Sequence, residues 1–492
     1  LVDIGRPVVD RATNQVVLEA DGSPKIAFGP KLDTACTTPV SEGMVVVTDS
    51  EKVKAARKEV VEFLLTSHPL DCPVCDKGGE CPLQNLTMKH GASQSRFLFD
   101  EKMHLGKHVP LGELILLDRE RCIQCGRCTR FQHEVVDDPV IGFYQRGRSL
   151  EIVTLSEPGF DSIFSGNTTD ICPVGALTTV DFHFGARAWE MNSAASICNQ
   201  CPVGCNIVYN TRREAKSGGK MVIKRVMPRQ NEEVNETWIC DKGRFAFHSV
   251  ESMERLTQPL VRKNGKLEPA SWQEALDITA EAFKKAFRER LVLASGRLSN
   301  EDLFNLRVLA GEGQAVLYSP MGGGEYTVRV GVGPGTNFSE LGKGSTILVV
   351  ASDLHEEAPL WWLRVKQAAE RGATLIVLNA RPTRLDKYAA HILRYNPGDE
   401  AALVSALLPA TAIKGTDEIQ AVSQAFAKAE NSLILFGSDG LGLAESTALA
   451  HACADLLQQT NHVGRAKNGL IGVWPNGNTQ GAFELGFAPI AD

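Results

Sequence analysis

Cysteine is very unevenly distributed along this chain of 492 residues. Eleven of its thirteen cysteines lie between positions 72 and 240, and the other two, Cys36 and Cys453, stand alone. In a chain without a recognisable secretory signal, tightly spaced cysteines indicate metal or redox chemistry rather than disulfides. We therefore expect bound metal, more than apolar packing, to organise the segment from 72 to about 245.

One group of cysteines is typical of an iron-sulfur cubane. The run "RERCIQCGRC" spaces Cys122, Cys125 and Cys128 as C-x2-C-x2-C, which suits three corners of one [4Fe-4S] cluster. The best fourth ligand is Cys172 in "TDICPVGAL", because a Cys-Pro pair commonly completes such sites.

Another group repeats this pattern further along the chain. Its first three members, Cys198, Cys201 and Cys205, share the loop "CNQCPVGC". Cys240 in "WICDKGRF" is a natural fourth member, so this group also reaches the four sulfur ligands that a [4Fe-4S] cluster requires.

The remaining group finds only three cysteines. The stretch "HPLDCPVCDKGGEC" holds Cys72, Cys75 and Cys81, with two glycines that let the loop wrap between the last two. Cys36 could serve as the fourth ligand, but a strand and a long helix separate it from the loop. His68 is close enough in sequence, and imidazole replaces thiolate on iron in some clusters. We expect His68 to complete this site and its neutral ring to raise the cluster potential.

Zinc is the alternative occupant of such groups. Zinc ribbons bring two separate C-x2-C pairs to one ion, whereas here three cysteines share a loop and the fourth ligand of the later two groups is distant. The spacing favours iron-sulfur clusters.

Charged residues surround the Cys122 run, and two interpretations of them stay open. Arginines there could favour the reduced, more negative cluster, or they could form an ordinary solvated surface. These arginines are Arg119, Arg121, Arg127 and Arg130. We expect the nearby His133, Glu134, Asp137 and Asp138 to be a solvated polar face rather than a catalytic site.

The N-terminal region predicts a β-rich remnant followed by a helix. Residues 1–43 resemble the end of a small β unit, and "MVVVTDS" predicts a strand. Ser50 is a plausible N-cap for a helix that Pro69 stops, with an apolar face at helical spacing. That face comprises Val53, Ala56, Val60, Phe63 and Leu64.

Beyond about residue 255 the pattern becomes that of an α/β domain. Ser271 and Glu274 form a capping-box signature before a helix. Apolar strand candidates at 345–353, 373–380 and 431–438 are each followed by helical stretches, which predicts a doubly wound parallel sheet. We expect the domains to be 1–43, 44–190, 191–250 and 251–492.

Several other features carry little functional signal. The glycine-rich stretches "SPMGGGEYTVRVGVGPG" and "FGSDGLG" fit poorly as strand-to-helix dinucleotide turns, so we interpret them as loops or caps. We expect Cys453 in "LAHACADLL" to be a buried structural thiol. The net charge of -7 disfavours nucleic-acid binding, and no apolar run is long enough to span a bilayer.

Five motifs in order closely resemble the large, 75-kDa-type iron-sulfur subunit of bacterial NADH-quinone oxidoreductase. They are "HPLDCPVCDKGGECPLQ", "DRERCIQCGRC", "GNTTDICPVGAL", "CNQCPVGC" and "WICDKGRF". The resemblance implies three [4Fe-4S] clusters on the three groups described above. It also implies a ferredoxin-like, loop-rich α+β region followed by a molybdopterin-oxidoreductase-like α/β domain, here without molybdenum because no cysteine lies between Cys240 and Cys453.

The family also has an N-terminal [2Fe-2S] domain, and "KLDTACTTPV" resembles the segment with its last ligand. Cys36 matches that ligand, and the other three would lie before Leu1. We therefore expect the sequence to be a piece of a longer protein, cut at both ends, in which only the full-length form holds the [2Fe-2S] cluster.

The resemblance implies an electron-transfer subunit of respiratory complex I. Its partners would be the NADH- and FMN-binding flavoprotein and further iron-sulfur subunits, on the cytoplasmic face of the inner membrane. Electrons would pass from NADH toward quinone, coupled in the complex to proton translocation, with membrane contact only through the complex. A formate dehydrogenase α subunit, a hydrogenase-associated diaphorase subunit and a zinc-stabilised scaffold are the alternatives.

Overall fold

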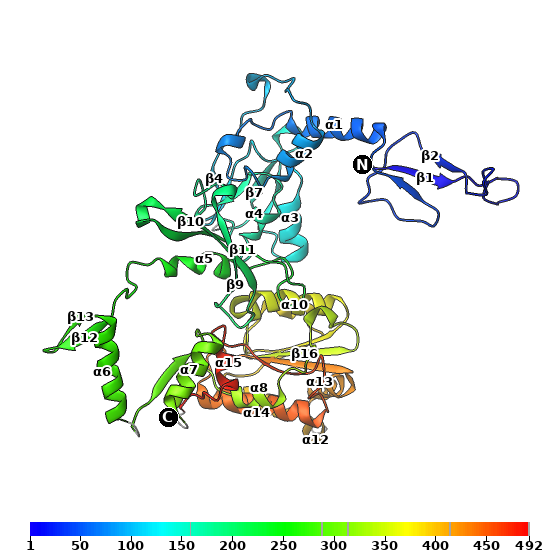
Figure 1. Ribbon diagram of the computed structural model, residues 1–492. Helices are drawn as coiled ribbons and strands as arrows, with labels where there is room; N and C mark the ends of the chain where they lie inside the picture. The colour runs from blue at the N-terminus through cyan, green and yellow to red at the C-terminus, as the bar shows by residue number, and fades with distance from the viewer. Residues whose placement is uncertain (158, 287–288, 312–313, 413–414, 491–492) are drawn as a thin grey trace. The chain divides into compact units, whose positions relative to one another are not determined.

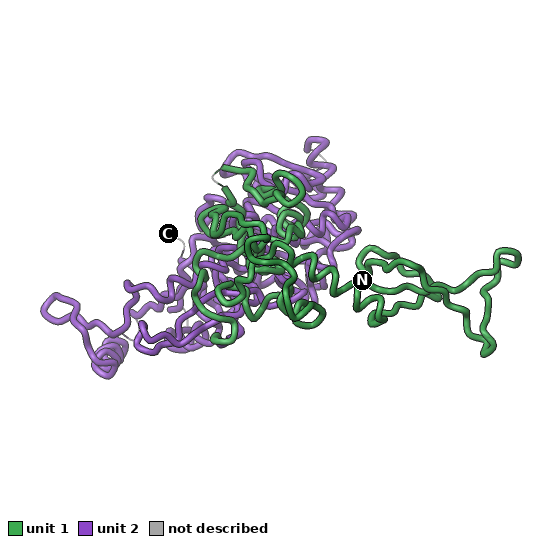
Figure 2. Tube along the Cα trace, turned by 90° about the horizontal axis from the view of Figure 1, so that it is seen from above, with its two compact units in different colours: residues 1–191 green, residues 192–492 purple. Residues whose placement is uncertain are grey.

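The computed structural model describes residues 1–490 except 158, 287–288, 312–313 and 413–414. Two compact units make up the chain, Leu1–Met191 and Asn192–Asp492 (Figure 2). Within the described ranges, no helix is both long enough and apolar enough to cross a membrane.

The first unit begins with a small antiparallel sheet and a long helix (Figure 1). Strands β1 (Asp3–Pro7), β2 (Ile26–Phe28) and β3 (Val45–Val47) pair in the order β2-β1-β3. Helix α1 (Glu51–Leu65) follows, and the Ser50 side chain accepts a hydrogen bond from the Val53 amide, which confirms the expected N-cap.

The expected apolar face of α1 is only partly correct. Val53 and Val61 are buried, but Val60 is 48% and Phe63 76% exposed. The face turned to the protein is therefore narrower than the sequence pattern, because only one side of this helix meets other described elements.

The rest of the first unit is made of short elements. Its core includes Cys81 and Cys172 together with Ile115, Leu117 and Leu177, so two cysteines of the metal motifs belong to the apolar core itself. The elements are α2 (Pro82–His90), β4 (Val109–Pro110), β5 (Ile115–Leu117), α3 (Arg127–Arg130), β6 (Ile141–Tyr144), β7 (Glu151–Thr154), α4 (Asn167–Ile171) and β8 (Leu177–Thr179). Strands β4, β5 and β8 form one sheet, and β6 and β7 form a hairpin.

The second unit opens with an antiparallel sheet in the order β11-β10-β9. Its strands are β9 (Asn192–Ile197), β10 (Asn206–Glu214) and β11 (Lys220–Pro228), followed by α5 (Asp241–Phe245). A hairpin of β12 (Leu260–Lys263) and β13 (Lys266–Pro269) then leads to α6 (Trp272–Lys285). Ser271 caps α6 as expected, while the Glu274 carboxylate lies 2.6 Å from Lys263 Nζ.

A five-stranded parallel sheet forms the centre of the second unit. Its order is β18-β17-β16-β19-β20, and the three strand candidates from the sequence are its middle strands. These are β16 (Ser345–Val350), β17 (Thr374–Leu378) and β19 (Asn431–Phe436), flanked by β18 (His391–Leu393) and β20 (Gly469–Gly472). All six residues of β16 are buried, as expected for a parallel strand covered on both faces. The predicted doubly wound α/β class is confirmed.

Helices cover both faces of this sheet. Figure 1 shows α10 (Pro359–Glu370) on one side, with α13 (Asp417–Lys428) and α14 (Leu443–Gln459) on the other. Cys453 lies inside α14 and is fully buried, as predicted. The remaining elements are β14 (Val292–Ser295), α7 (Asn300–Ala310), β15 (Ala315–Tyr318), α8 (Gly324–Val330), α9 (Leu354–Glu357), α11 (Glu400–Ala406), α12 (Pro409–Ala412) and α15 (Thr479–Glu484).

Both glycine-rich stretches begin between a strand and a helix, the first between β15 and α8 and the second between β19 and α14. Their interpretation as loops or caps is confirmed, because Gly323 is the N-cap of α8 and Gly442 is the N-cap of α14. The first stretch also packs closely against neighbouring helices. A Cβ on Gly323 would lie 2.4 Å from the Cβ of Ala450, and a Cβ on Gly324 would lie 2.1 Å from the Phe483 ring. These glycines let α8 approach α14 and α15 closely.

We expect Gly324→Ala to destabilise the sheet domain by about 1–3 kcal/mol, because the added methyl group overpacks against Phe483. Native-state hydrogen exchange of the α8 and α15 amides measures this loss. Gly335→Ala is the control, since its Cβ meets no atom within 4 Å and only its positive φ of 78° opposes the change. Equal losses in the two variants would contradict the packing role.

Candidate metal centres

The loop that follows α1 carries the first group. Cys72 begins a 3-10 turn (Cys72–Val74), and the Cys75 amide donates to the Cys72 carbonyl at 3.4 Å. Cys81 is the N-cap of α2, and its sulfur accepts a hydrogen bond from the Gln84 amide at 3.5 Å. Burial and Cys81 raise the pKa of Cys72, so the sulfurs of this loop interact with one another.

Both glycines of this loop are required by its geometry. Gly79 has a φ of 91°, which side chains rarely adopt. A Cβ on Gly78 would lie 2.9 Å from the Cys72 carbonyl and 3.0 Å from that of Cys75. The predicted wrapping of the loop between Cys75 and Cys81 is confirmed.

His68 has the protonation state that a metal ligand needs. Burial, with help from Arg121 and Lys102, lowers the pKa of His68 to about 4, so the ring is neutral near pH 7. Its Nδ1 atom is buried without a hydrogen-bond partner. A neutral imidazole with an unpartnered buried nitrogen fits a ligand role.

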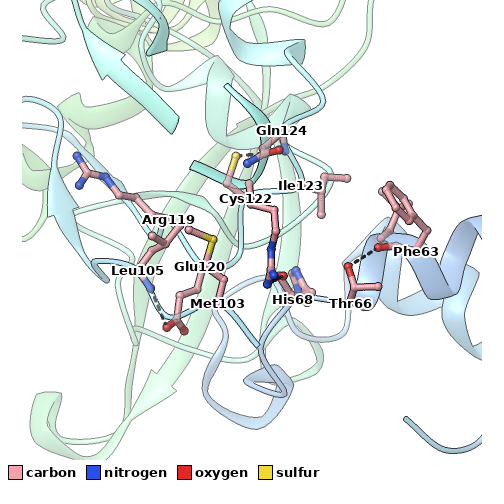
Figure 3. A pocket seen from close by; sticks show the side chains of 14 residues that line it. Phe63, Thr66, His68, Met103, Leu105, Arg119, Glu120, Cys122, Ile123 and Gln124 are labelled. Atoms are coloured by element: carbon pink, nitrogen blue, oxygen red, sulfur yellow. Dashed lines mark hydrogen bonds between the residues drawn. The ribbon is translucent and has the colours of Figure 1, made fainter. Parts of the chain in front are cut away.

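His68 and Cys122 line one pocket of about 480 Å³ (Figure 3). Arg119, Glu120 and Gln124 line it too. The structure therefore brings His68 into the same pocket as Cys122 of the second group, a proximity that spacing along the chain does not reveal.

The second group encloses a single apolar cavity. Cys122, Cys125, Cys128 and Cys172 all line it, together with aliphatic residues that include Leu117, Ile152 and Leu177. Cys128 belongs to the short helix α3, and Cys172 is the C-cap of α4. The structure thus brings the distant Cys172 to the three-cysteine run.

Burial and mutual repulsion disfavour free thiolates in this cavity. Burial, reinforced by Cys172, raises the pKa of Cys128 to about 12, and burial raises the pKa of Cys122 to about 11. Burial raises the pKa of Cys172 too, and thiols that resist ionisation fit a positively charged iron core, which would stabilise their thiolate form. The donor set therefore fits a cluster.

The third group is the most deeply buried. Cys198, Cys201, Cys205 and Cys240 are between 2% and 7% exposed. The loop joins β9 to β10, with the Cys198 amide donating to the Cys205 carbonyl at 2.8 Å. Burial raises the pKa of Cys240 to about 12 and that of Cys201 to about 11, and in each case a neighbouring thiol of the group adds to the effect.

Sequence reasoning missed Asn235, which fixes the chain before Cys240. This fully buried side chain accepts from the Asn206 amide at 2.9 Å and donates to the Arg229 and Trp238 carbonyls at 3.3 and 3.1 Å. No local pattern could have revealed it, because its partners come from three separate turns and strands.

Cys36 differs from the other cysteines of the N-terminal half. The sequence holds no other cysteine before Cys72, so Cys36 belongs to no group, and it is exposed, as Cys72 and Cys125 are. Among the described residues, no group of three or more His, Cys, Asp and Glu side chains is close enough to hold a single metal ion. A single zinc ion would need each sulfur at about 2.3 Å, whereas a [4Fe-4S] cluster binds each cysteine at a different iron.

The polar residues around the Cys122 run differ in their exposure to solvent, whereas the sequence predicts that all of them are solvated. Glu134 pairs with Arg130 on the surface at 2.9 Å, in line with a solvated face. Asp138, however, is only 8% exposed, so its assignment to that face is wrong. The chain turns inward there, where the Asp138 amide donates to the Gln132 carbonyl at 2.8 Å.

Family models match the same segments. The descriptions are "NADH-ubiquinone oxidoreductase-G iron-sulfur binding region" for residues 57–96, "NADH-quinone oxidoreductase subunit 3, ferredoxin-like domain" for 112–178, "NADH-ubiquinone oxidoreductase NDSU1/NuoG-like, 4Fe-4S domain" for 194–248 and "Molybdopterin oxidoreductase" for 255–491. The G subunit of the NADH-quinone oxidoreductase of Streptomyces coelicolor is 38% identical over 463 residues, covering 88% of this chain and 53% of its own. NADH-quinone oxidoreductase subunit 3 of Thermus thermophilus is 35% identical over 529 residues, covering 99% and 64%.

The chain belongs to the family of these NADH-quinone oxidoreductase iron-sulfur subunits. It spans between half and two thirds of the length of these two relatives. Among solved structures, acetylene hydratase from Pelobacter acetylenicus overlaps 54% of this chain and 42% of its own at 20% identity and a TM-score of 0.41, which is too slight a likeness to support an argument. The iron-sulfur domains expected from the motifs are thus confirmed as [4Fe-4S]-binding domains of this family.

In this member of the NADH-quinone oxidoreductase family, acidic groups gather at the carboxyl edge of the parallel sheet. Ser352 donates to Glu357, and Arg381 lies 2.9 Å from Asp353 and 4.0 Å from Asp439. Burial, with help from Asp439 and Asp353, raises the pKa of Glu357 to about 7. This edge is where doubly wound sheets bind ligands, yet here carboxyl groups outnumber the arginine.

The raised pKa of Glu357 predicts a pH-dependent stability. The folded domain binds a proton there between about pH 4.5 and 7 that the unfolded chain releases, so stability falls as pH rises through this window. We expect the wild-type sheet domain to lose about 1–3 kcal/mol between pH 5 and 8 that Glu357→Gln does not lose. Unfolding midpoints at several pH values measure it. The exposed neighbour Glu356 provides the control variant Glu356→Gln, which should keep the wild-type slope.

Proposed function

We propose that this chain is an electron-transfer subunit of a NADH-quinone oxidoreductase that carries three [4Fe-4S] clusters. The first is held by His68, Cys72, Cys75 and Cys81. The second is held by Cys122, Cys125, Cys128 and Cys172, and the third by Cys198, Cys201, Cys205 and Cys240. The observation that carries the proposal is the apolar cavity lined by all four cysteines of the second group.

The clusters supply one-electron transfer when bound, and the residues of the chain hold and tune them. Neutral His68 replaces one thiolate and so leaves its cluster less negative. Backbone amides donate to sulfur at Cys81 and at Cys122, where the Gln124 amide lies 3.4 Å away, and such bonds favour the reduced state. Burial keeps water from the sulfurs of the third group.

The partners follow from the family. A flavoprotein subunit would oxidise NADH at FMN and pass electrons to these clusters, and further iron-sulfur subunits would receive them on the way to quinone. The assembly would lie at the cytoplasmic face of the inner membrane, where electron transfer is coupled to proton translocation. Cys36 would be the last ligand of a [2Fe-2S] cluster that only the longer protein completes.

The molybdopterin-oxidoreductase domain serves as a scaffold without molybdenum in this proposal. The carboxyl groups of Asp353, Asp439 and Glu357 lie around the guanidinium of Arg381 at the carboxyl edge of its sheet, which makes this part of the edge a poor site for a phosphate-bearing pterin. Molybdenum in the purified protein would instead support the formate dehydrogenase alternative.

Metal analysis of the anaerobically purified chain tests the proposal. We expect about twelve iron and twelve sulfide per chain from three [4Fe-4S] clusters, with a reducible EPR signal. Cys172→Ala should lower the iron content by about four atoms, because it removes a ligand of the second cluster. Cys453→Ala is the matched control and should change nothing, since Cys453 lies in the apolar core of α14. Zinc without iron would refute the redox role.

Replacing the imidazole tests the first site. We expect His68→Cys to retain its cluster at a lower potential, because an anionic ligand replaces a neutral one. EPR-monitored redox titration measures the shift. His133→Cys, at an exposed histidine, should leave every potential unchanged. An unmoved potential in His68→Cys would show that His68 is not a ligand.

A further inference from the structure

The side chain of Arg121 makes its ion pairs away from Cys122, the cysteine that follows it in the sequence. Although it precedes Cys122, its guanidinium turns to Asp71, beside Cys72. Arg121 Nε and Nη2 lie 3.2 and 3.0 Å from Asp71 Oδ2, and Nε lies 3.2 Å from Asp118. The Arg121 side chain is only 3% exposed, so this cation is held out of water.

Gly175 shows how close Arg121 comes to Cys75. A Cβ on Gly175 would lie 2.2 Å from the Cys75 sulfur, 3.3 Å from the Cβ of Lys77 in the same loop and 3.7 Å from Arg121 Cδ. Arg121 thus approaches the same point as the first-group sulfur.

Lys77 belongs to the first loop, but its side chain contacts the helix that leads to the second group. It lies between Cys75 and Cys81 in the first loop, yet its Nζ donates to the Thr169 carbonyl at 3.0 Å. Thr169 belongs to α4, the helix that ends at Cys172.

Other charges surround the two cations without replacing them. Lys107 lies between Asp71 and Glu120, at 2.5 and 2.7 Å. Arg187 donates to the Cys75 carbonyl at 2.7 Å, and Asp76 lies close to His183. Arg121 is buried and comes from the second loop, and its alkyl chain approaches the same point beside Gly175 as the Cys75 sulfur. Lys77 starts near that point too, but its amine contacts α4.

We propose an exchange of cationic side chains between the loops of the first two centres. Arg121, which belongs to the loop of the second centre, sets the potential of the first cluster. Lys77, which belongs to the loop of the first centre, sets the potential of the second cluster. The inference rests on the proposed function, in that both groups hold clusters. Reduction adds a negative charge to a cluster, and a cation held nearby in a medium of low dielectric constant stabilises that charge.

Redox titration of the full-length chain with its clusters, purified anaerobically, tests the exchange. The signal that shifts in His68→Cys identifies the first cluster. We expect Arg121→Gln to make that cluster harder to reduce by about tenfold in the ratio of reduced to oxidised form, equivalent to about 59 mV for one electron. The second cluster, which follows Arg121 directly in sequence, should keep its potential, and Arg121→Lys should recover most of the shift.

The complementary variant reverses the pattern. Lys77→Gln should make the second cluster harder to reduce and leave the first unchanged, although Lys77 lies inside the first loop. Arg130→Gln is the matched control, because Arg130 stands two residues after Cys128 but is 72% exposed and pairs with Glu134. It should move neither potential.

Arg121→Gln leaves buried carboxylates without their partner, so this variant can fail to assemble. A second variant, for which we expect a potential shift in the opposite direction, keeps the test decisive in that case. Asp71→Asn removes a negative charge beside Arg121 and should make the first cluster easier to reduce. The exchange is overturned if Arg121→Gln or Asp71→Asn moves the second cluster instead, or if neither moves the first. Absence of iron and of EPR signals in the unaltered chain would refute the proposed function itself.

Discussion

Thiols crowded together out of water are the constraint on which the first unit depends. Cys81 and Cys172 belong to its apolar core, and the second group lines a cavity in that core. Burial raises the pKa of Cys122, Cys128 and Cys172, so the apo protein holds weakly polar groups where a packed domain would hold aliphatic ones. Metal binding releases their protons and joins separate loops at one point, and the free energy of that binding becomes folding free energy.

Two different kinds of interaction stabilise the two parts of the second unit. Its first part follows the same logic, with four buried cysteines and Asn235 holding short loops in place. Its parallel sheet needs no metal, because aliphatic residues bury both faces of β16 and its neighbours. The core of this sheet domain is therefore built from the chain's own side chains.

The features that the sequence predicts correctly depend on interactions between residues that are close together in the chain. The Ser50 cap, the aliphatic strands and the cysteine spacings depend on residues a few positions apart, so they can be read directly. The position of Arg121 cannot, because its partner Asp71 lies 50 residues away and adjacency points to the wrong centre. Phe63 and Asp138 fail for a related reason: helical spacing and polarity do not say which face meets another element.

Gly175 also bears on the order in which the protein is built. The Cys75 sulfur lies where a side chain at 175 would begin, and the Cys81 thiol donates to the Pro173 carbonyl at 3.4 Å. The surroundings of the first loop are therefore incomplete until the ribosome has added about a hundred further residues. During synthesis the first cysteines to emerge therefore lack part of their final surroundings until residues 173–175 have followed them.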